Sequence, residues 1–337
     1  MSLYIPQNYR NLLGGPEQTE KAIKAVKDMF QVNLSAQLAL LRVTAPMMVL
    51  SGQGLNDDLN GVERPVKFPV KSMDDAPAEV VHSLAKWKRL KLAELGVEPG
   101  RGIYTDMNAL RPDEDLDNIH SIYVDQWDWE KVMRPEERTE AFLHKIVRRI
   151  YEAVKVTENK LYVEFPQITP MLPEDIFFIG AEELLQRYPN LNPKERENAI
   201  TKEYGAVFIQ GIGGKLSNGE AHDGRAADYD DWSLNGDILI WYPWLEKAVE
   251  LSSMGVRVDA RSLRSQLEHA GHTDWAKLDY HRAVLEDRLP LTIGGGIGQS
   301  RLCMVLLHKQ HIGEVQVSEW SDDEMRRCLE QDIELLH

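Results

Sequence analysis

The stretch "LTIGGGIGQSRL", Leu291–Leu302, has three consecutive glycines, a fourth at Gly298 and then Arg301. Glycine loses more backbone entropy on folding than any other residue, so the run favours a place where something approaches the chain closely. A dinucleotide fingerprint fails here because Gln299 stands at the third glycine position, and no register supplies the lysine of a Walker A loop. The stretch predicts a strand that ends in the glycines and a helix that begins near Gln299. A plain strand-to-helix turn remains an alternative to a ligand-binding one.

The chain on either side of this stretch predicts long helices and paired strands. Apolar residues recur at helical spacing from Pro16 to about Leu41, which predicts one long amphipathic helix. "LLRVTAPMMVL" then predicts a strand that carries Pro46, at an edge or interface. "AEVVHSLAKWKRLKLAELG" predicts a short strand, a turn at His82-Ser83 and a helix that Gly96 ends.

Two predicted pairs of strands set the fold class. "GIYTDMNAL" and "SIYVDQWDWEKV" bracket the acidic loop "PDEDLDNIH", and "GDILIWYP" and "EKAVELSSMGVRVD" surround a second turn, so both pairs read as antiparallel. "GAVFIQGI" predicts another strand, followed by the loop "GGKLSNGEAHDGRAADYDDWS". Helices are expected at 137–160, 180–188, 193–204 and near 260–288. The pattern indicates an α+β fold, an antiparallel sheet flanked by helices, and not the alternation of a doubly wound fold.

Composition is that of an ordinary soluble globular protein, with 43% hydrophobic and 28% charged residues among 337. No apolar run approaches the roughly 20 residues of a membrane span, and "MSLYIPQNYR" lacks a signal-peptide core, so a cytoplasmic protein without a membrane partner is expected. Two cysteines, Cys303 and Cys328, offer neither a disulfide framework nor zinc spacing. The net charge of −15 disfavours nucleic acid as a partner.

One strand face and one arginine suggest a polar binding site. Strand periodicity puts Gln126, Asp128 and Glu130 on one face and the tryptophans Trp127 and Trp129 on the other. The polar face is either a solvated surface or the wall of a pocket. Arg111 leads into the loop that joins this strand to its partner, and an arginine beside carboxylates can hold a phosphate while the carboxylates hold an ammonium group.

Further charged residues give weaker signals. Asp237 and Glu250 lie on predicted paired strands, an arrangement that suits a magnesium ion bridging phosphates. Asp228 and Glu246 are expected on solvated faces. Lys88 lies in the first turns of a predicted helix, where it is either a surface lysine or an anion ligand.

Three segments in this order resemble the motifs of the class II aminoacyl-tRNA synthetases. "RVTAP" after the long helix resembles motif 1, Arg111 through "VDQWDWE" resembles motif 2, and "GGGIGQSR" fits motif 3. The resemblance implies one catalytic domain over 1–337, with motif 1 at about 16–50, motif 2 at about 102–131 and motif 3 at about 290–310. It also implies that the glycines let a nucleotide lie against the strand and that Arg301 meets it. The motif 3 pattern falls on Gly294, Gly296, Gly298 and Arg301.

Nearly the whole chain resembles the ammonia-dependent aspartate–ammonia ligases. The similar segments are "HSLAKWKR", "LRPDED", "YVDQWDWE", "DYDDW", "LNGDIL", "ELSSMG" and "TIGGGIGQSRL". The family implies that aspartate, ammonia and ATP give asparagine, AMP and pyrophosphate through a β-aspartyl-adenylate, with Mg²⁺ as cofactor. It also implies a homodimer formed through the motif 1 region. An aminoacyl-transferring synthetase and an inactive synthetase-like regulator are the alternatives. Because the motif 1 helix begins near Pro16, we expect no appended anticodon-binding domain.

The resemblance also implies a role for each site residue. The residues implied in catalysis are Asp57, Arg111, Asp128, Asp230 and Arg301. Those implied in substrate binding are Ser83, Lys88, Gln126 and Arg257. Those implied in nucleotide binding are Arg111, Ser121, Asp237, Glu250, Ser253, Gly294, Gly296, Gly298 and Arg301, with Asp237 and Glu250 also holding the metal.

Three carboxylates are candidates for the base that deprotonates ammonium. Ammonium must lose a proton before it attacks, and Asp57, Asp128 or Asp230 could take it.

Other family members should have a longer connection between "DYDDWS" and "LNGDIL", whereas Ser233 abuts Leu234 here. Either the chain has a deletion or a mobile loop is missing from it.

Overall fold

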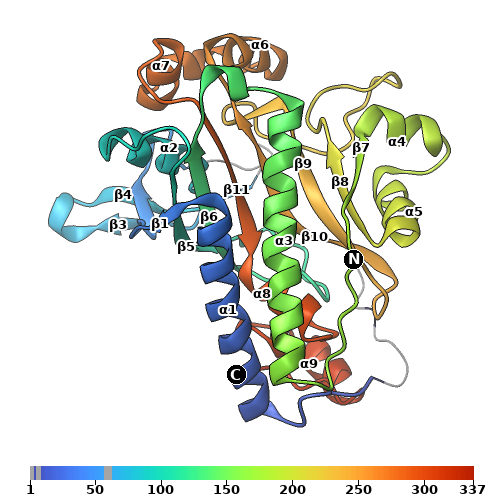
Figure 1. Cartoon of the computed structure of the whole chain (residues 1–337). Coiled ribbons are helices and arrows are strands. Elements are labelled where there is room, and N and C mark those ends of the chain that lie inside the picture. Colours follow the sequence, from blue (N-terminus) through green and yellow to red (C-terminus); the bar gives the residue numbers. More distant parts are fainter. Residues whose placement is uncertain (1–3, 5–8, 57–62) are drawn as a thin grey trace.

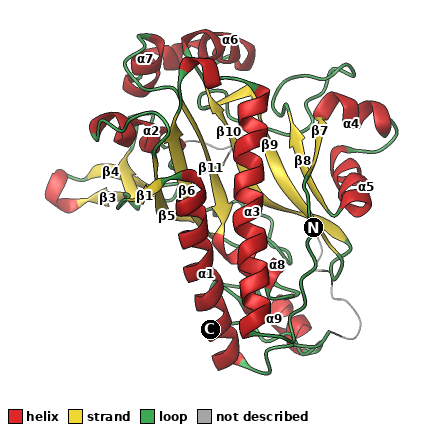
Figure 2. Cartoon of the chain, in the orientation of Figure 1, coloured by secondary structure: helices red, strands yellow, loops and turns green. Residues whose placement is uncertain are grey.

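A computed structural model describes residue 4, residues 9–56 and residues 63–337. In this part of the chain the centre is an eight-stranded sheet in the order β1-β5-β6-β11-β10-β9-β8-β7, antiparallel except for the parallel pairs β1–β5 and β7–β8 at its two edges (Figures 1 and 2). Its strands are β1 (Leu40–Arg42), β5 (Gly102–Leu110), β6 (Tyr123–Val132), β11 (Thr292–Gly298), β10 (Lys247–Arg257), β9 (Asp230–Tyr242), β8 (Ala206–Gln210) and β7 (Phe177–Gly180). The expected antiparallel α+β architecture is confirmed.

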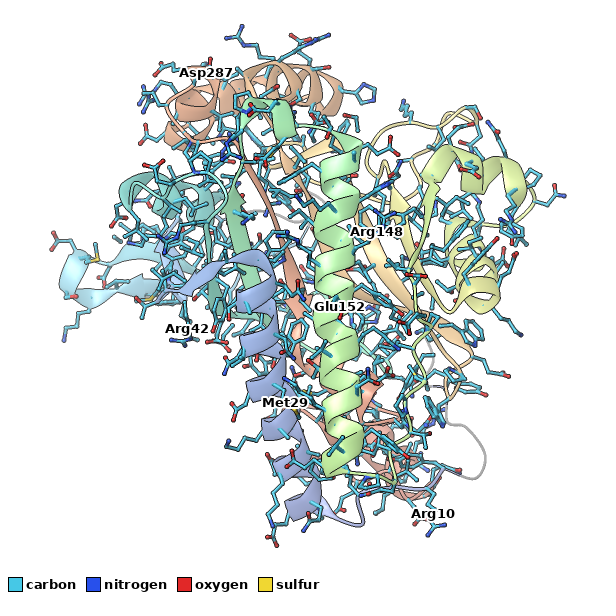
Figure 3. The ribbon with its side chains drawn as sticks, in the orientation of Figure 1. Arg10, Met29, Arg42, Arg148, Glu152 and Asp287 are labelled. Carbon is cyan, nitrogen blue, oxygen red and sulfur yellow. The ribbon has the colours of Figure 1, made fainter. Side chains whose placement is uncertain are left out.

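Two long helices cover one face of this sheet. The helices α1 (Pro16–Leu38) and α3 (Glu140–Glu164) lie side by side in Figure 1. The apolar side of α1 packs inward, and its Phe30 ring lies 4.7 Å from the ring of Trp127 on β6. Trp127 and Trp129 are both almost fully buried, as the strand periodicity predicts. Figure 3 shows Arg148 and Glu152 on the outer side of α3, so this helix turns charged side chains outward and apolar ones toward the sheet.

The remaining helices surround the other face and the ends of the sheet. They are α2 (Ala85–Glu94), α4 (Ala181–Arg187), α5 (Pro193–Tyr204), α6 (Ala260–Ala270), α7 (Asp279–Leu285), α8 (Gln299–Leu306) and α9 (Asp322–Leu329). Short 3-10 turns lie at Lys71–Met73, Pro135–Glu137, Thr273–Lys277 and Ile312–Glu314. Capping by side chains fixes where some of these helices begin. The side chain of Asn192 accepts from the backbone N–H of Glu195 at 3.0 Å, and Pro193 occupies the first position of α5.

The prediction of one strand around Pro46 is wrong. β1 joins the main sheet, whereas β2 (Met48–Leu50) pairs with β4 (Ala76–Val80) in a separate sheet that also contains β3 (Lys67–Val70). Pro46 lies in the connection between them. A proline has no backbone N–H to donate to a neighbouring strand. The chain therefore passes from one sheet to the other at a residue that could not complete the strand pairing.

The segment "DYDDWS" is mostly strand, and its prediction as loop is wrong. β9 begins at Asp230 and runs without interruption through Ser233 and Leu234 to Tyr242. Its early residues still pair with β10, since Asp230 is the register partner of Arg257. The short connection is therefore a continuous strand in this chain. Among the described helices, none is long and apolar enough to cross a membrane.

Candidate active site

A cavity of about 490 Å³ opens on the face of the sheet opposite to α1 and α3. β6 explains this placement, because Trp127 faces α1 while Gln126 and Asp128, one residue to either side, line the cavity. The polar strand face is thus the wall of a pocket. The cavity is lined by these predicted site residues: Ser83, Lys88, Arg111, Ser121, Gln126, Asp128, Asp230, Asp237, Glu250, Ser253, Arg257, Gly296, Gly298 and Arg301. Gly294 does not line it, and Asp57 lies outside the described residues.

The glycines of β11 make room for side chains of the two neighbouring strands. In register, Gly294 lies beside Glu130 and Gly296 beside Asp128 of β6. A Cβ atom on Gly294 would lie 2.5 Å from the carboxyl carbon of Glu130 and 2.6 Å from Nη2 of Arg257. A Cβ atom on Gly296 would lie 2.9 Å from the amide carbon of Gln126. Gly294 therefore lies beneath an ion pair, which differs from the expected contact with a nucleotide.

That ion pair joins β6 to β10. Arg257 donates from Nε to Oε1 of Glu130 at 3.0 Å and from Nη2 to Oε2 at 2.8 Å, and its Nη1 contacts Asp230. All three side chains are at most 2% exposed. Burial raises the pKa of Glu130, but Arg257 and Lys88 outweigh burial and hold this pKa below its usual value. The arginine is thus already bonded to two carboxylates before any substrate is present.

Lys88 from α2 reaches the same floor. Its Nζ bonds to Oδ1 of Asp128 and donates to the carbonyl of Gly295 at 3.1 Å. Burial lowers the pKa of Lys88, and Asp128 acts against this shift. The second oxygen of Asp128, Oδ2, is buried and accepts no hydrogen bond from any described residue. A buried carboxylate oxygen without a donor suits a cationic ligand. Ser83 stands at the start of α2, where its Oγ accepts from the N–H of Ala85 at 3.1 Å.

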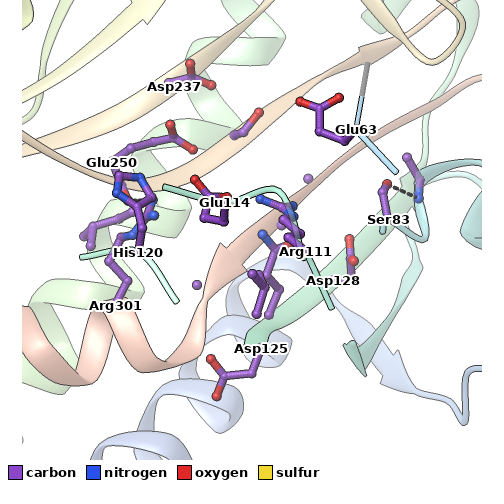
Figure 4. A pocket seen from close by; sticks show the side chains of 18 of the residues that line it. Glu63, Ser83, Arg111, Glu114, His120, Asp125, Asp128, Asp237, Glu250 and Arg301 are labelled. Carbon is purple, nitrogen blue, oxygen red and sulfur yellow. Dashed lines mark hydrogen bonds between the residues drawn. The ribbon is translucent and has the colours of Figure 1, made fainter. Parts of the chain in front are cut away.

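Two arginines also line the cavity. Figure 4 shows Arg111 beside Asp128, and Arg301 beside Glu250. Arg301 donates to the carbonyl oxygens of Glu250 at 2.9 Å and of Ile119 at 3.3 Å. The Nε of Arg111 is buried and has no acceptor in the described part of the chain. Both guanidinium groups can therefore offer donors to an anion.

Asp237 and Glu250 form an acidic corner on β9 and β10. Asp237 is the register partner of Ser253, and Glu250 lies three residues before that serine. Burial raises the pKa of Asp237 to about 7; Arg225 opposes the shift and Glu250 adds to it. No group of three or more acidic, histidine or cysteine side chains that could hold a metal occurs among the residues described. The pair alone still fits Mg²⁺, which is commonly held by one or two carboxylates together with phosphates and water.

Sequence reasoning missed several residues of this wall. Arg225, which the sequence placed in a loop, is 8% exposed and bonds to Asp237 and Ser253. Lys194, the second residue of α5, contacts Asp223 at 3.1 Å. His120 precedes β6 and lines the cavity beside Ser121, which was predicted. Arg225 and His120 lie outside helices and strands, where no periodicity could have revealed them, and Lys194 is in the first turn of a helix whose spacing does not mark a site.

Comparison with known proteins identifies the family of the chain. The aspartate-ammonia ligase family model matches residues 17–332. A protein of Bacteroides thetaiotaomicron named aspartate–ammonia ligase is 57% identical over 343 aligned positions that cover 99% of both chains. One of Clostridium perfringens with the same name is 58% identical over 334 positions, again 99% of both. The first alignment is longer than the 337-residue chain, so that relative has residues this chain lacks, whereas the second leaves little room for an insertion.

Solved structures with low sequence identity show the fold. Asparaginyl-tRNA synthetase of Entamoeba histolytica, in complex with asparaginyl-adenylate, matches with a TM-score of 0.64 at 14% identity, over 89% of this chain and 66% of that one. The aspartyl-tRNA synthetase of the same organism matches with a TM-score of 0.62 at 12% identity, over 90% of this chain and 58% of that one. This chain therefore spans two thirds or less of their length, and its fold is that of the class II synthetases. With a family model over most of its length and relatives at 57–58% identity, the chain belongs to the aspartate–ammonia ligase family.

Proposed function

We propose that the cavity carries out the reaction of this family, the ATP-dependent synthesis of asparagine from aspartate and ammonia. The observation that carries the proposal is the floor of the cavity, where Lys88, Arg257 and the unpartnered oxygen of Asp128 lie together. Two cations and an open carboxylate oxygen match the two charged groups of an amino acid. Arg111 and Arg301 stand beside them as donors for the phosphates of ATP.

Aspartate is proposed to enter with its α-carboxylate on Lys88 and Arg257. Its α-ammonium group donates to Oδ2 of Asp128, which has no other donor among the described residues. This orientation leaves the β-carboxylate pointing toward Arg111, where the α-phosphate of ATP would lie. Gln126, whose amide lies over Gly296, is placed to bind the substrate between the two ends.

Activation of the β-carboxylate requires that negative charge be neutralised. A β-carboxylate oxygen attacks the α-phosphorus, pyrophosphate leaves, and a β-aspartyl-adenylate forms. Arg111 and Arg301 stabilise charge that grows on the α-phosphate and on the leaving pyrophosphate. Asp237 and Glu250 would hold Mg²⁺, which when bound neutralises phosphate charge as a Lewis acid. Ser121, Ser253, Gly296 and Gly298 line the same part of the cavity and would contact the nucleotide.

Ammonia completes the reaction. Its nitrogen attacks the β-carbonyl carbon, AMP departs with the electron pair of the acyl–oxygen bond, and one N–H proton must leave. Asp230 already bonds to Arg257 and lies 3.8 Å from Nε of Arg225, which makes it a poorer base than a carboxylate with a free oxygen. In the proposed orientation Oδ2 of Asp128 receives the α-ammonium group and Oδ1 bonds to Lys88, so Asp128 has no oxygen left for this proton, and Asp57 lies outside the described residues.

Free ammonia, and not glutamine, is the proposed nitrogen donor. A glutaminase needs an activated nucleophile, usually a cysteine thiolate. Cys303 is fully buried in α8, and burial raises its pKa to about 12. Burial also raises the pKa of Cys328 to about 12. Neither thiol can supply a thiolate at neutral pH. Two free buried cysteines also suit the cytoplasm, where we place the enzyme.

A homodimer is proposed, with a revised interface. The apolar face of α1 was expected to contribute, but its residues pack within the chain against the sheet and α3. The exposed apolar side chains of this region lie instead at Leu41, Met47 and Met48, which are 59%, 62% and 50% exposed. Leu41 lies on β1, an edge strand of the main sheet, while Met47 precedes β2 and Met48 begins it. An edge strand with apolar neighbours is suited to pair with a second copy.

Product analysis separates the proposal from its alternatives. Purified protein with aspartate, ATP and Mg²⁺ should release pyrophosphate steadily only when ammonium is added, with one asparagine formed per AMP. An aminoacyl-transferring synthetase would also exchange pyrophosphate into ATP, but it would label tRNA or a protein lysine and form no asparagine. An inactive regulator would show no exchange. Absence of asparagine with ammonium present would refute the proposed function.

A further inference from the structure

Arg225 bonds to one carboxylate oxygen of Asp237 and to the hydroxyl of Ser253, which are assigned to the proposed metal and nucleotide. The segment between β8 and β9 carries it into the cavity, where its side chain is 8% exposed. Its Nη2 donates to Oδ1 of Asp237 at 2.6 Å, and its Nη1 donates to Oγ of Ser253. Its Nε lies 3.8 Å from Oδ2 of Asp230. The guanidinium thus contacts the corner assigned to Mg²⁺ and phosphate.

The electrostatics of this corner favour a cation there at all times. Asp237 and Glu250 repel each other, and Arg225 neutralises part of that charge. A divalent ion on Asp237 would meet a guanidinium bonded to the same carboxylate, and the two cations would repel each other. Arg225 and the metal therefore compete for Asp237. A guanidinium that leaves a carboxylate needs another anion, and a phosphate offers the same two-pronged geometry.

We propose that Arg225 is a resident counter-cation of Asp237 in the nucleotide-free enzyme, and that it moves to a phosphate of ATP when the nucleotide binds and so releases Asp237 to the divalent ion. This inference rests on the proposed function. It makes the binding of metal and of nucleotide mutually dependent, because each removes a competitor or supplies a partner for the other. The factor by which nucleotide tightens metal binding must then equal the factor by which metal tightens nucleotide binding.

Mn²⁺ binding without turnover tests the exchange. Binding of Mn²⁺ is measured by electron paramagnetic resonance at pH 8, above the pKa of Asp237, with and without a non-hydrolysable ATP analogue and with no aspartate present. In the unaltered protein the analogue should tighten Mn²⁺ binding strongly. Arg225→Gln should bind Mn²⁺ without the analogue about 10- to 100-fold more tightly than the unaltered protein, the factor expected from loss of one charge-assisted hydrogen bond. In Arg225→Gln the analogue should then tighten Mn²⁺ binding by a correspondingly smaller factor than in the unaltered protein.

Two further variants separate competition from loss of charge or of fold. Arg225→Lys keeps a cation near Asp237 and should bind Mn²⁺ as weakly as the unaltered protein. Lys194→Gln removes a positive charge from the same cavity, where Lys194 contacts Asp223 at 3.1 Å, and frees no oxygen of Asp237. Its effect on Mn²⁺ binding should be much smaller than that of Arg225→Gln. Unchanged unfolding temperatures establish that each variant folds.

The outcomes distinguish this inference from the proposal beneath it. If the analogue fails to tighten Mn²⁺ binding in the unaltered protein, both the metal site and the exchange are wrong. If the analogue tightens binding but Arg225→Gln binds free Mn²⁺ no better than the unaltered protein, the exchange is wrong and the metal site stands. Equal gains in Arg225→Gln and Lys194→Gln would also overturn it, because they would show a general charge effect.

Discussion

Replacing Arg257 by alanine should have two separable effects, one on stability and one on aspartate binding. Arg257 forms a two-pronged ion pair with Glu130, which is fully buried. Removing the arginine leaves a buried carboxylate without its main partner, a change that destabilises proteins by roughly 3–5 kcal/mol. Loss of a charge-assisted contact to the substrate α-carboxylate should raise the aspartate concentration for half-maximal rate by about 10- to 100-fold.

A second substitution separates these effects. In Arg257→Ala with Glu130→Gln the buried charge of Glu130 is gone, while Asp230 loses one partner and keeps Arg225 at 3.8 Å, so a substantial part of the lost free energy of unfolding should return, as measured by urea unfolding. The aspartate requirement in aspartate-dependent exchange of pyrophosphate into ATP should remain high, while the ATP requirement changes little. Glu130→Gln alone serves as the control. If the double variant regains normal aspartate affinity, Arg257 acts only by neutralising Glu130 and does not bind the substrate.

Three other changes have defined outcomes. Arg301→Lys keeps one charge but loses the planar fork, so pyrophosphate exchange should fall about 10-fold or more while the unfolding temperature stays unchanged; normal exchange would refute the role of Arg301. Burial lowers the pKa of His308 from 6.5 to about 4. As the pH falls, the unfolded chain is therefore protonated at this histidine before the folded one, and the free energy of unfolding should fall by about 3 kcal/mol between pH 6.5 and pH 4. His308→Asn, which suits its left-handed backbone, should flatten this decline in unfolding experiments against pH. Leu41→Glu should weaken the proposed dimer, and sedimentation that shows an unchanged dimer would place the interface elsewhere.

Sequence reasoning reached the strands and helices that have regular patterns. The period of two on β6 placed Trp127 in the core and Asp128 in the cavity, and helical spacing placed α1 to within three residues at its end. These features depend on local periodicity, which survives in a sequence read alone. The motif resemblance supplied the residues of the cavity wall that periodicity could not connect, such as Lys88 and Arg257.

What the sequence could not provide depends on contacts between distant segments. The glycines of β11 were expected to admit a nucleotide, yet Gly294 makes room for Glu130 and Arg257, which come from different strands. Arg225 is in a loop and gains its importance only from β9 and β10, where its partner Asp237 lies. The same limit applies to Pro46, because no local signal says that the chain passes from one sheet to another there.

The orientation of the amino acid is the central claim, and a crystal structure with asparagine and AMP bound tests it most directly. The α-carboxylate should lie within hydrogen-bonding distance of Lys88 and Arg257, the α-ammonium group should donate to Oδ2 of Asp128, and the carboxamide should face Arg111 and the phosphate of AMP. A structure in which the carboxamide contacts Arg257 and the α-carboxylate faces the phosphate would contradict the account.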